Sequence, residues 1–542
     1  MPVIRSRPRG LPRPRGLRPR LTYRSAAAAA AAIVAISALA ACGSSSPNGS
    51  SAAGSGSAAG ASGVSGTLNW EWELPTSWDP VTSSAGWDMH VLGLVYASVT
   101  TLNAKGDVEP GLASSWKYAA DGKSVTFTLR PGLKFSDGTP LTATSVQQNI
   151  RRGLTQSNST VAAELAVISK VVVNSPASFT LDLSQVDYQL PDLLAGKDGM
   201  IVNPAYFKNV SSLATKPEGA GPFTLTSYVP DSHANLVRNA SYWDAGQIHI
   251  ANFNVQSITQ PEQILSALES GQVNVAYIAG NQVASAKAAG FKIDVIPSEV
   301  VNELDVQTTT APFTSPKVVQ AINYAINRQA ILQVQASGYG AVAYQPFPAG
   351  FVGYSAKLAN QYPYNPALAR QLLAQAGYPN GLNITLTSSS AADDSLAEQI
   401  QGQLQQVGIS VTIKDIAADT STQLLYLNKS IPLAVDGTAG RMSPVEMLDV
   451  LYSQQGLMNV TGKATTTAPE VSSALSKALT VPLDSPGYPA ALQNAVETAV
   501  QQEPIHIWLY TNPRIFAYSP TVSGIPSDLV QQRWEGVTVS GG

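Results

Sequence analysis

The side chains that most often perform catalysis or bind metals are few in this sequence and far apart. The four histidines stand at positions 90, 233, 249 and 506, never closer than sixteen residues, so no two can face one metal from a single helix turn. The single cysteine excludes an internal disulfide and any site built from several thiolates. The chain also has no nucleophile-elbow motif, Walker loop or dinucleotide-binding glycine motif. The sequence therefore predicts no metal, no cofactor and no enzyme active site.

Composition narrows the class of protein further. A chain of 542 residues is long enough for two or more domains, and 44% hydrophobic residues can build sizeable cores. Only 13% of the residues are charged and the formal net charge is −3. Nucleic-acid binding requires clustered basic side chains that neutralise phosphates, and this chain has no basic excess. The composition predicts a multidomain globular protein that does not bind nucleic acid.

The chain begins with a segment typical of secretion. Residues 1–24 contain eight arginines and no acid, and the small or apolar run Ala26–Ala41 follows. This run of sixteen residues is shorter than the roughly 20 of a membrane-spanning helix and matches the core of a signal peptide. It ends in Leu39-Ala40-Ala41-Cys42, which resembles the bacterial lipobox. The resemblance implies that residues 1–41 are a lipoprotein signal peptide and that a diacylglycerol on Cys42 anchors the protein to the extracytoplasmic face of the cell membrane.

An ordinary secretory peptide with an unrelated cysteine is the alternative to the lipobox. Residues 42–66 contain the anchor cysteine followed by a Gly/Ser/Ala-rich stretch, which we interpret as a flexible tether. A coil of that length spans on the order of 25–30 Å, enough to hold a folded body just off the membrane. Removing the eight leader arginines from 33 basic residues leaves 25 against 36 acidic ones, a mature net charge of −11.

The remaining chain shows both periodicities of an α/β protein. Alternation of apolar and polar residues predicts strands over residues 67–73, 124–130 and 383–387. Helical periodicity predicts helices over residues 316–336, 366–376, 394–407 and 488–502. Gly377 and Gly408 are expected to end two of these helices. The adjacent acids Asp393 and Asp394 are best interpreted as a helix N-terminus, where carboxylates complement the helix dipole.

Several segments of this body occur in a recognisable order. They are SWDP (77–80), GDVEPGLASSWKYAADGKSVTFTLRPGLKFSDGTPLTATSV (106–146), GAGPFTLTSYVP (219–230), RNASYW (238–243), ALESGQVNVAYI (267–278), APFTSPKVVQAINYAINRQAI (311–331), YNPALARQLLAQAGYPNG (364–381) and AEQIQGQLQQVGISVTI (397–413). Their order resembles the family-5 extracellular solute-binding proteins, the dipeptide, oligopeptide and nickel receptors of ABC importers. The turns, strands and helix starts in these segments also make sense as scaffold, without any catalytic group.

The resemblance implies an α/β, bilobal fold of the periplasmic-binding-protein type, with an extra subdomain and two lobes joined by short crossovers around a ligand cleft. Lobe I would comprise residues 67–102, 220–302 and 505–542, and its extra subdomain would comprise residues 103–219. Residues 303–504 would form lobe II. Ligand would stabilise the closed state by contacting both lobes.

The resemblance also implies the function. The protein would be a monomeric, membrane-anchored receptor that captures a peptide or peptide-like small solute and delivers it to an ABC permease driven by separate ATPase subunits. No bond would be made or broken. Two alternatives stay open: a surface lipoprotein of the same fold used for signalling or adhesion, and a receptor for a non-peptide solute such as a sugar or a chelated metal.

Candidate ligand-binding residues follow from a few aromatic and charged side chains. Glu73 and Leu74 end the first strand, where the family's first lobe reaches its ligand, and Trp87 belongs to a local group of four tryptophans that also holds Trp70, Trp72 and Trp78. Trp70 and Trp72 share one face of that strand and are better interpreted as core. Trp508 and Tyr510, in the returning crossover, are candidates for either cleft or core.

Peptide-binding members of the family hold the peptide's α-ammonium with an aspartate about three residues before an Asp-Pro pair. Here Ser443-Pro444 replaces that pair, and the aspartate position falls at Gly440 or Arg441. Asp436 could substitute for the missing aspartate if the loop is remodelled. Arg441 could instead bind a ligand carboxylate through its planar fork, or form a structural ion pair.

Overall fold

The computed structural model describes residues 63–258, 260–438, 441–454, 456–461, 468–528 and 530–540. The predicted signal peptide, Cys42, almost all of the predicted tether and Gly440 lie outside the described residues. All of the described residues belong to one compact unit.

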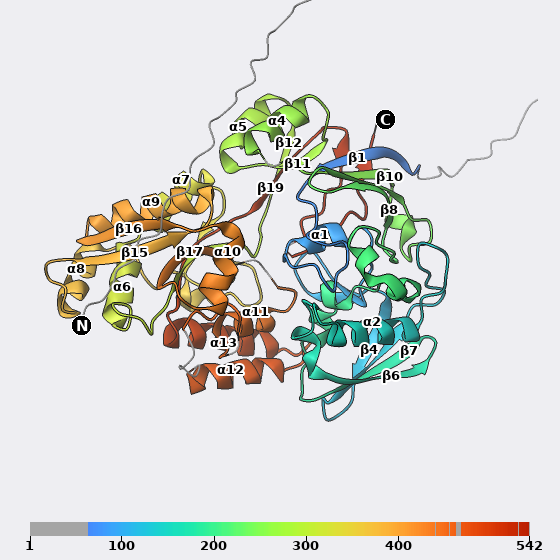
Figure 1. The fold of residues 1–542 in the computed structure, drawn as a ribbon, viewed down its shortest axis with the longest axis horizontal. Coiled ribbons are helices and arrows are strands. Elements are labelled where there is room, and N and C mark those ends of the chain that lie inside the picture. The colour runs from blue at the N-terminus through green and yellow to red at the C-terminus, as the bar shows by residue number, and fades with distance from the viewer. Residues whose placement is uncertain are drawn as a thin grey trace, which may run out of the picture. The chain divides into compact units, whose positions relative to one another are not determined.

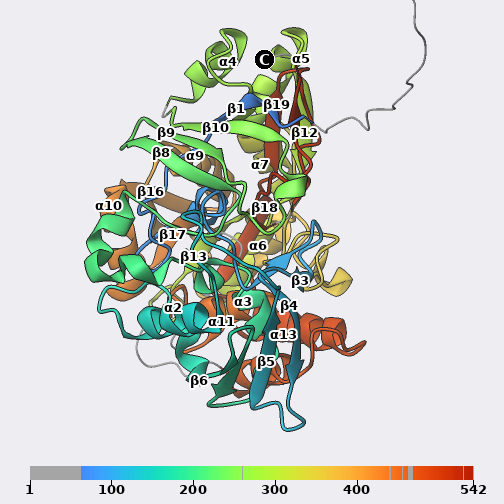
Figure 2. The same cartoon turned by 90° about the vertical axis from the view of Figure 1, so that its right-hand side faces the viewer.

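A seven-stranded mixed sheet is built from both ends of the body (Figures 1 and 2). Its central strand β1 runs parallel to both of its neighbours, β10 and β11. Trp70, fully buried in β1, packs against Phe253 and Trp534, which ties the two ends of the body together in one core. In spatial order the strands are β12 (Lys292–Ile296), β19 (Arg514–Tyr518), β11 (Val275–Tyr277), β1 (Ser65–Glu71), β10 (Ile250–Gln256), β9 (His233–Arg238) and β8 (Phe223–Val229).

Short helices and a small antiparallel sheet accompany this layer. The helices are α1 (Asp88–Leu92), α3 (Leu190–Leu193), α4 (Pro261–Glu269) and α5 (Val283–Ala288). The small sheet has the order β4 (Ala113–Tyr118), β5 (Ser124–Leu129), β7 (Ser178–Leu183) and β6 (Ile168–Ser175), and α2 (Ala143–Thr155) packs against β6 and β7. Two further strand pairs, β2 (Thr100–Leu102) with β3 (Val108–Pro110) and β20 (Val522–Ser523) with β21 (Thr538–Val539), complete this part.

A buried ion pair fixes α2 to the segment after β1. Asp79, in the Ser77–Pro80 turn, binds the Arg152 guanidinium, and both side chains are buried. Arg152 also donates from Nε to Gln156 Oε1 at 2.8 Å and lies over the Phe207 ring at 5.0 Å. The turn singled out in the sequence is therefore part of the scaffold.

The second large sheet has six strands. Its order is β14 (Ala341–Val342), β18 (His506–Thr511), β13 (Val301–Val306), β17 (Leu433–Thr438), β15 (Leu382–Ser388) and β16 (Ile409–Asp415). One core cluster joins this sheet to α6 (Pro316–Ala325), α7 (Arg328–Ala336), α8 (Pro366–Gln375) and α9 (Ala391–Gln405). Another joins it to α11 (Pro444–Tyr452), α12 (Pro469–Leu479) and α13 (Tyr488–Gln502), near α10 (Ala418–Thr422) and a π-helical turn over Gln423–Leu427. The sheet is thus covered on both faces.

The chain passes between the two large sheets twice. Residues 297–300 connect β12 to β13, and residues 512–513 connect β18 to β19. Both connections are short, which suits a hinge in which a few residues absorb a change in backbone angles. The lobe boundaries expected from the sequence stay a prediction.

The local predictions agree with the elements, with one exception. The single helix expected over residues 316–336 is wrong, because it is divided into α6 and α7. Ile326 takes an extended conformation, and the Asn327 side chain accepts a hydrogen bond from Ala330 N at 3.0 Å, which starts a new helix. Asp393 and Asp394 lie in the first turn of α9, as predicted. Gly377 and Gly408, with φ of +93° and +91°, lie in the turns that close α8 and α9.

Candidate ligand-binding site

A cavity of about 660 Å³ lies at the carboxyl ends of the three parallel strands β1, β10 and β11. Ligands of α/β proteins bind in the crevice outside the carboxyl ends of such strands, because the loops that follow them diverge there. The volume falls in the range of small-molecule sites. The cavity is lined by Glu71, Trp72, Glu73, Leu74, Trp87, Met89, His90, Asp231, Ser257, Ile258, Pro261, Ile264, Tyr277, Ser298, Glu299, Val300, Asn512, Arg514 and Val530.

Both passages between the large sheets contribute to the wall. Ser298, Glu299 and Val300 come from the first passage, while Asn512 and Arg514 come from the second and the start of β19. A solute in this cavity would touch the segments that must move if the two sheets rotate relative to one another. The cavity is therefore placed to couple ligand binding to closure.

Trp72 forms the aromatic wall. Its ring stacks on that of Trp70 at 4.9 Å and meets the rings of His90 and Tyr277 edge-on at 5.1 and 5.8 Å. Within the described part of the chain, its indole N–H has no hydrogen-bond partner. Trp72 thus lines the cavity with an aromatic ring that its neighbours hold in place, and its indole N–H is buried without a partner among the described residues.

Arg514 is the buried cation of the site. Its Nη1 donates to Val530 O at 3.2 Å and its Nη2 donates to Asp528 O, whereas Nε has no partner in the described residues. Burial lowers the pKa of Arg514 to about 10, so it stays charged at neutral pH. One N–H of this guanidinium is therefore buried without a partner among the described residues, a cost that a ligand oxygen would relieve.

His90 and two glutamates complete the polar lining. The His90 ring accepts a hydrogen bond at Nδ1 from Gln532 N at 2.8 Å, and burial lowers its pKa well below the usual value, so the ring is neutral. Burial raises the pKa of Glu71 and of Glu299 to about 8. Glu71 accepts from Tyr277 N at 3.2 Å, and Oε1 of Glu299 has no partner among the described groups. The site therefore holds carboxyl groups that change charge near neutral pH.

These two glutamates give a prediction for stability. Between about pH 5 and pH 8 the folded chain holds both protons and the unfolded chain releases them, so the free energy of unfolding falls as pH rises. The loss is complete once the pH exceeds the folded-state pKa of about 8. Chemical denaturation across this range should show a steeper fall for the wild type than for the double variant Glu71→Gln/Glu299→Gln. If the free energy of unfolding fell equally with pH in the two proteins, the raised pKa values of Glu71 and Glu299 would be contradicted.

The structure brings three of the sequence-predicted residues together in this cavity. Glu73 and Leu74 follow β1 directly, and Trp87, 48% exposed, precedes α1. Trp508 and Tyr510 instead lie buried in β18, in the cores on opposite faces of the six-stranded sheet, and do not line the cavity.

Asp436 and Arg441 lie outside the cavity wall as well. Asp436, in β17, binds the Tyr426 hydroxyl and accepts from Gly437 N at 2.7 Å. Arg441 Nη1 lies 3.9 Å from Glu164 Oε1 and 4.0 Å from Glu446 Oε1, so its partners here are protein carboxylates. The next residue, Met442, packs in one cluster with the cavity-lining Met89 and Val530.

Sequence reasoning missed Trp72, which it assigned to the core, and missed Glu299 and Arg514 altogether. Arg514 did carry a signal in the sequence, since the apolar stretch Ile515–Tyr518 that follows it predicts a buried strand. A buried cation in such a strand needs a polar partner, so it marks either an internal ion pair or a ligand.

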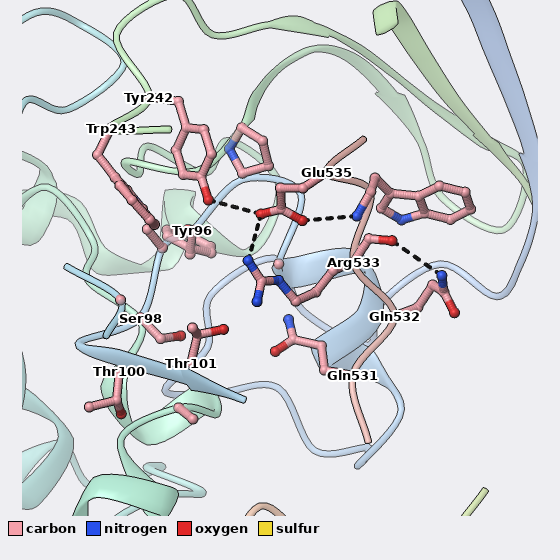
Figure 3. A pocket seen from close by; sticks show the side chains of 16 residues that line it. Tyr96, Ser98, Thr100, Thr101, Tyr242, Trp243, Gln531, Gln532, Arg533 and Glu535 are labelled. Carbon is pink, nitrogen blue, oxygen red and sulfur yellow. Dashed lines mark hydrogen bonds and ion pairs between the residues drawn. The ribbon is translucent and has the colours of Figure 1, made fainter. Parts of the chain in front are cut away.

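Two other hollows are less suited to a solute. The smaller hollow has a volume of about 50 Å³. Its wall contains a hydrogen-bond network in which Arg533 and Tyr242 both donate to Glu535 Oε1 at 3.0 Å (Figure 3). It has room for water only. The other, of about 970 Å³, lies beside the edge strand β4 and residues 482–489, away from the parallel strand ends.

Comparison with known proteins decides the family. Residues 107–459 match the model of the bacterial extracellular solute-binding proteins, family 5 (middle region). The chain belongs to this family. The match confirms the family resemblance that the sequence segments indicated. The protein therefore has a solute-binding role.

Individual relatives extend the match. The chain is 30% identical over 349 residues to the glutathione-binding protein GsiB of Salmonella typhi, which covers 62% of this chain and 67% of the relative. The periplasmic binding protein DppA of Helicobacter pylori, solved with the peptide STSA, superposes with a TM-score of 0.77 at 23% identity, over 89% of this chain and 99% of DppA. The binding protein AgaA of A. tumefaciens R10, solved with agropinic acid, gives 0.75 at 23% identity, over 88% and 99%. These neighbours confirm the α/β, bilobal periplasmic-binding-protein fold.

In the ranges that the structure describes, no helix combines the length and the apolar character needed to cross a membrane.

Proposed function

We propose that this family-5 member is the substrate-binding lipoprotein of an ABC importer and takes a peptide or peptide-like small solute into the 660 Å³ cavity at the ends of β1, β10 and β11. The observation that carries the proposal is the joint placement of Trp72, Arg514 and both inter-sheet passages around that cavity. Binding would favour a closed form, the form that docks on the permease. No bond in the solute would change.

The polar groups of the cavity match those of a peptide. The free N–H groups of Trp72 and Arg514 suit a carbonyl or carboxylate oxygen, and the carboxyl groups of Glu71 and Glu299 suit an N–H or an ammonium group. A short peptide presents all of these within a few bonds. Glutathione, for which the relative GsiB is named, and the peptide STSA bound to DppA have the same groups.

A non-peptide acid is the second candidate. AgaA, with the same fold, was solved with agropinic acid, and the unpaired Nε of Arg514 would bind its carboxylate equally well. The two candidates differ in whether backbone amides of the solute are needed.

Calorimetric titration of the purified full chain distinguishes them. The panel comprises di- and tripeptides, glutathione, a peptide amidated at its C-terminus, and agropinic acid. We expect micromolar or tighter binding of at least one peptide-type solute, with weaker binding of its amidated form. Binding of agropinic acid alone would favour the non-peptide acid, and no binding by any member would contradict the assigned ligand class.

We further propose that a lipid on Cys42 anchors the protein to the membrane. The receptor is a monomer and works with separate permease and ATPase chains. In bacterial cells the wild type should take up labelled palmitate and sediment with membranes, whereas Cys42→Ser should not be labelled. Equal labelling of both chains would overturn the lipid anchor. Peptide uptake by cells that express the chain together with its permease would separate transport from a purely signalling or adhesive role.

A further inference from the structure

A second cluster of chemically capable side chains lies in the six-stranded sheet, away from the cavity. Glu303 and Asp305 stand two residues apart in β13 and therefore point to the same face. His506 of β18 pairs with Asp305, and Asp436 of β17 pairs with Glu303, so all four belong to one face. Figure 2 shows β13, β17 and β18 close together. Pairing between distant strands thus collects residues that are isolated in the sequence.

The geometry of three of these residues is tight. One candidate ligand atom from each of Glu303, Asp305 and His506 lies within 4.8 Å of the others. His506 Nδ1 is 2.7 Å from Asp305 Oδ1 and 3.9 Å from Glu303 Oε1. The exposed fractions of Glu303, Asp305 and His506 are 0%, 1% and 5%.

One oxygen of this cluster is unsatisfied. Glu303 Oε1 is bound by the Thr438 hydroxyl, but Oε2 is buried and has no partner among the described residues. No lysine or arginine of the described chain lies within 4.0 Å of the Glu303 or Asp305 carboxylate. A buried carboxylate oxygen without donor or cation is costly, so the cluster is incomplete as it stands. A strand irregularity between Asn302 and Glu303 adds to this, since bulges often re-aim a side chain at a site.

The hydrogen bonds that surround Asp305 and His506 resemble those that orient the ligands of a metal site. His506 Nε2 lies 3.5 Å from Leu451 O, which orients the ring and leaves Nδ1 for the cluster. The Tyr426 hydroxyl lies 3.2 Å from Asp305 Oδ2 and also binds Asp436. Imidazole nitrogen with carboxylate oxygens is a donor set that zinc and similar divalent ions accept.

We propose that Glu303, Asp305 and His506 bind a divalent transition-metal ion of the zinc class. The ion replaces the hydrogen bond between His506 Nδ1 and Asp305 Oδ1, and Glu303 Oε2 gains a ligand bond. It fastens β13 to β18, the two strands that continue into the inter-sheet passages. The metal is structural, and the proposal does not depend on which solute the cavity takes.

The test uses the full chain, purified in mild detergent, stripped with a chelator and titrated with zinc chloride. Retained zinc is measured by mass spectrometry after gel filtration. We expect one zinc per chain in the wild type and in the control variant His249→Gln. In Glu303→Gln and His506→Gln the affinity should fall at least about tenfold, since even outer contacts of a metal site contribute 10–100-fold.

Circular dichroism of each variant shows whether it is folded. If either variant is unfolded, the wild type alone decides, because stoichiometric cobalt(II) should give visible d–d bands that zinc abolishes. The proposal is overturned if the wild type retains no zinc, if it shows no such bands, or if folded Glu303→Gln binds zinc as the wild type does. Those results would mean that the Glu303 and Asp305 carboxyl groups are neutralised by protons and not by a metal ion.

Discussion

Replacing Arg152 by methionine is expected to lower the free energy of unfolding by about 3–5 kcal/mol, the largest effect of any single change on stability considered for this protein. The substitution removes the cation that binds Asp79 and leaves a buried carboxylate without its partner. Because α2 carries Arg152 and the turn after β1 carries Asp79, the change also loosens the small sheet from the seven-stranded one.

Urea denaturation of two further variants isolates this cause. The double variant Asp79→Asn/Arg152→Met should recover part of the loss, since the amide is less costly to bury than the carboxylate. Lys357→Met breaks the ion pair with Glu497, in which the lysine is 77% exposed, and should cost less than about 1 kcal/mol. A loss in Arg152→Met no greater than in Lys357→Met would refute the prediction.

Replacing Trp72 by alanine should weaken binding of the solute by about 30-fold, or about 2 kcal/mol, as expected for a central aromatic anchor. The substitution removes the cavity-lining ring that stacks on Trp70, together with its unpartnered indole N–H. Calorimetry with the tightest-binding solute of the panel measures the effect.

Trp116→Ala is the matched control, because Trp116 is a partly buried tryptophan of β4 outside the cavity. It should bind the solute as the wild type does, within about twofold. If Trp72→Ala and Trp116→Ala weaken binding equally, then Trp72 does not contact the solute and the cavity is wrongly assigned.

Features set by neighbouring residues could be predicted from the sequence. The glycines after α8 and α9, the acidic first turn of α9 and the strand ending near Glu73 all depend on short-range preferences. Glu73 and Leu74 line the cavity because loops after parallel strands meet at one edge. The break between α6 and α7 was missed because Asn327 interrupts a continuous apolar pattern through a side-chain cap that periodicity does not register.

Features set by strand pairing could not be predicted. Asp305 and His506 are 201 residues apart and become neighbours only through the β13–β18 register. Arg514 and Glu299 reach the cavity from two separate passages between the sheets. Trp508 and Tyr510 were candidates for the cleft because they stand beside the expected crossover. They lie instead in β18, a strand buried on both faces.

Native mass spectrometry of the full chain released from detergent, with and without the peptide panel, shows whether the cavity holds a peptide-type solute. We predict a one-to-one complex of the wild type with a peptide-type solute, carried over from the cells or formed on addition, and far less of it in Trp72→Ala. A solute bound equally by both proteins, or no complex with any peptide, would contradict a peptide-type receptor whose site is the cavity at the ends of β1, β10 and β11.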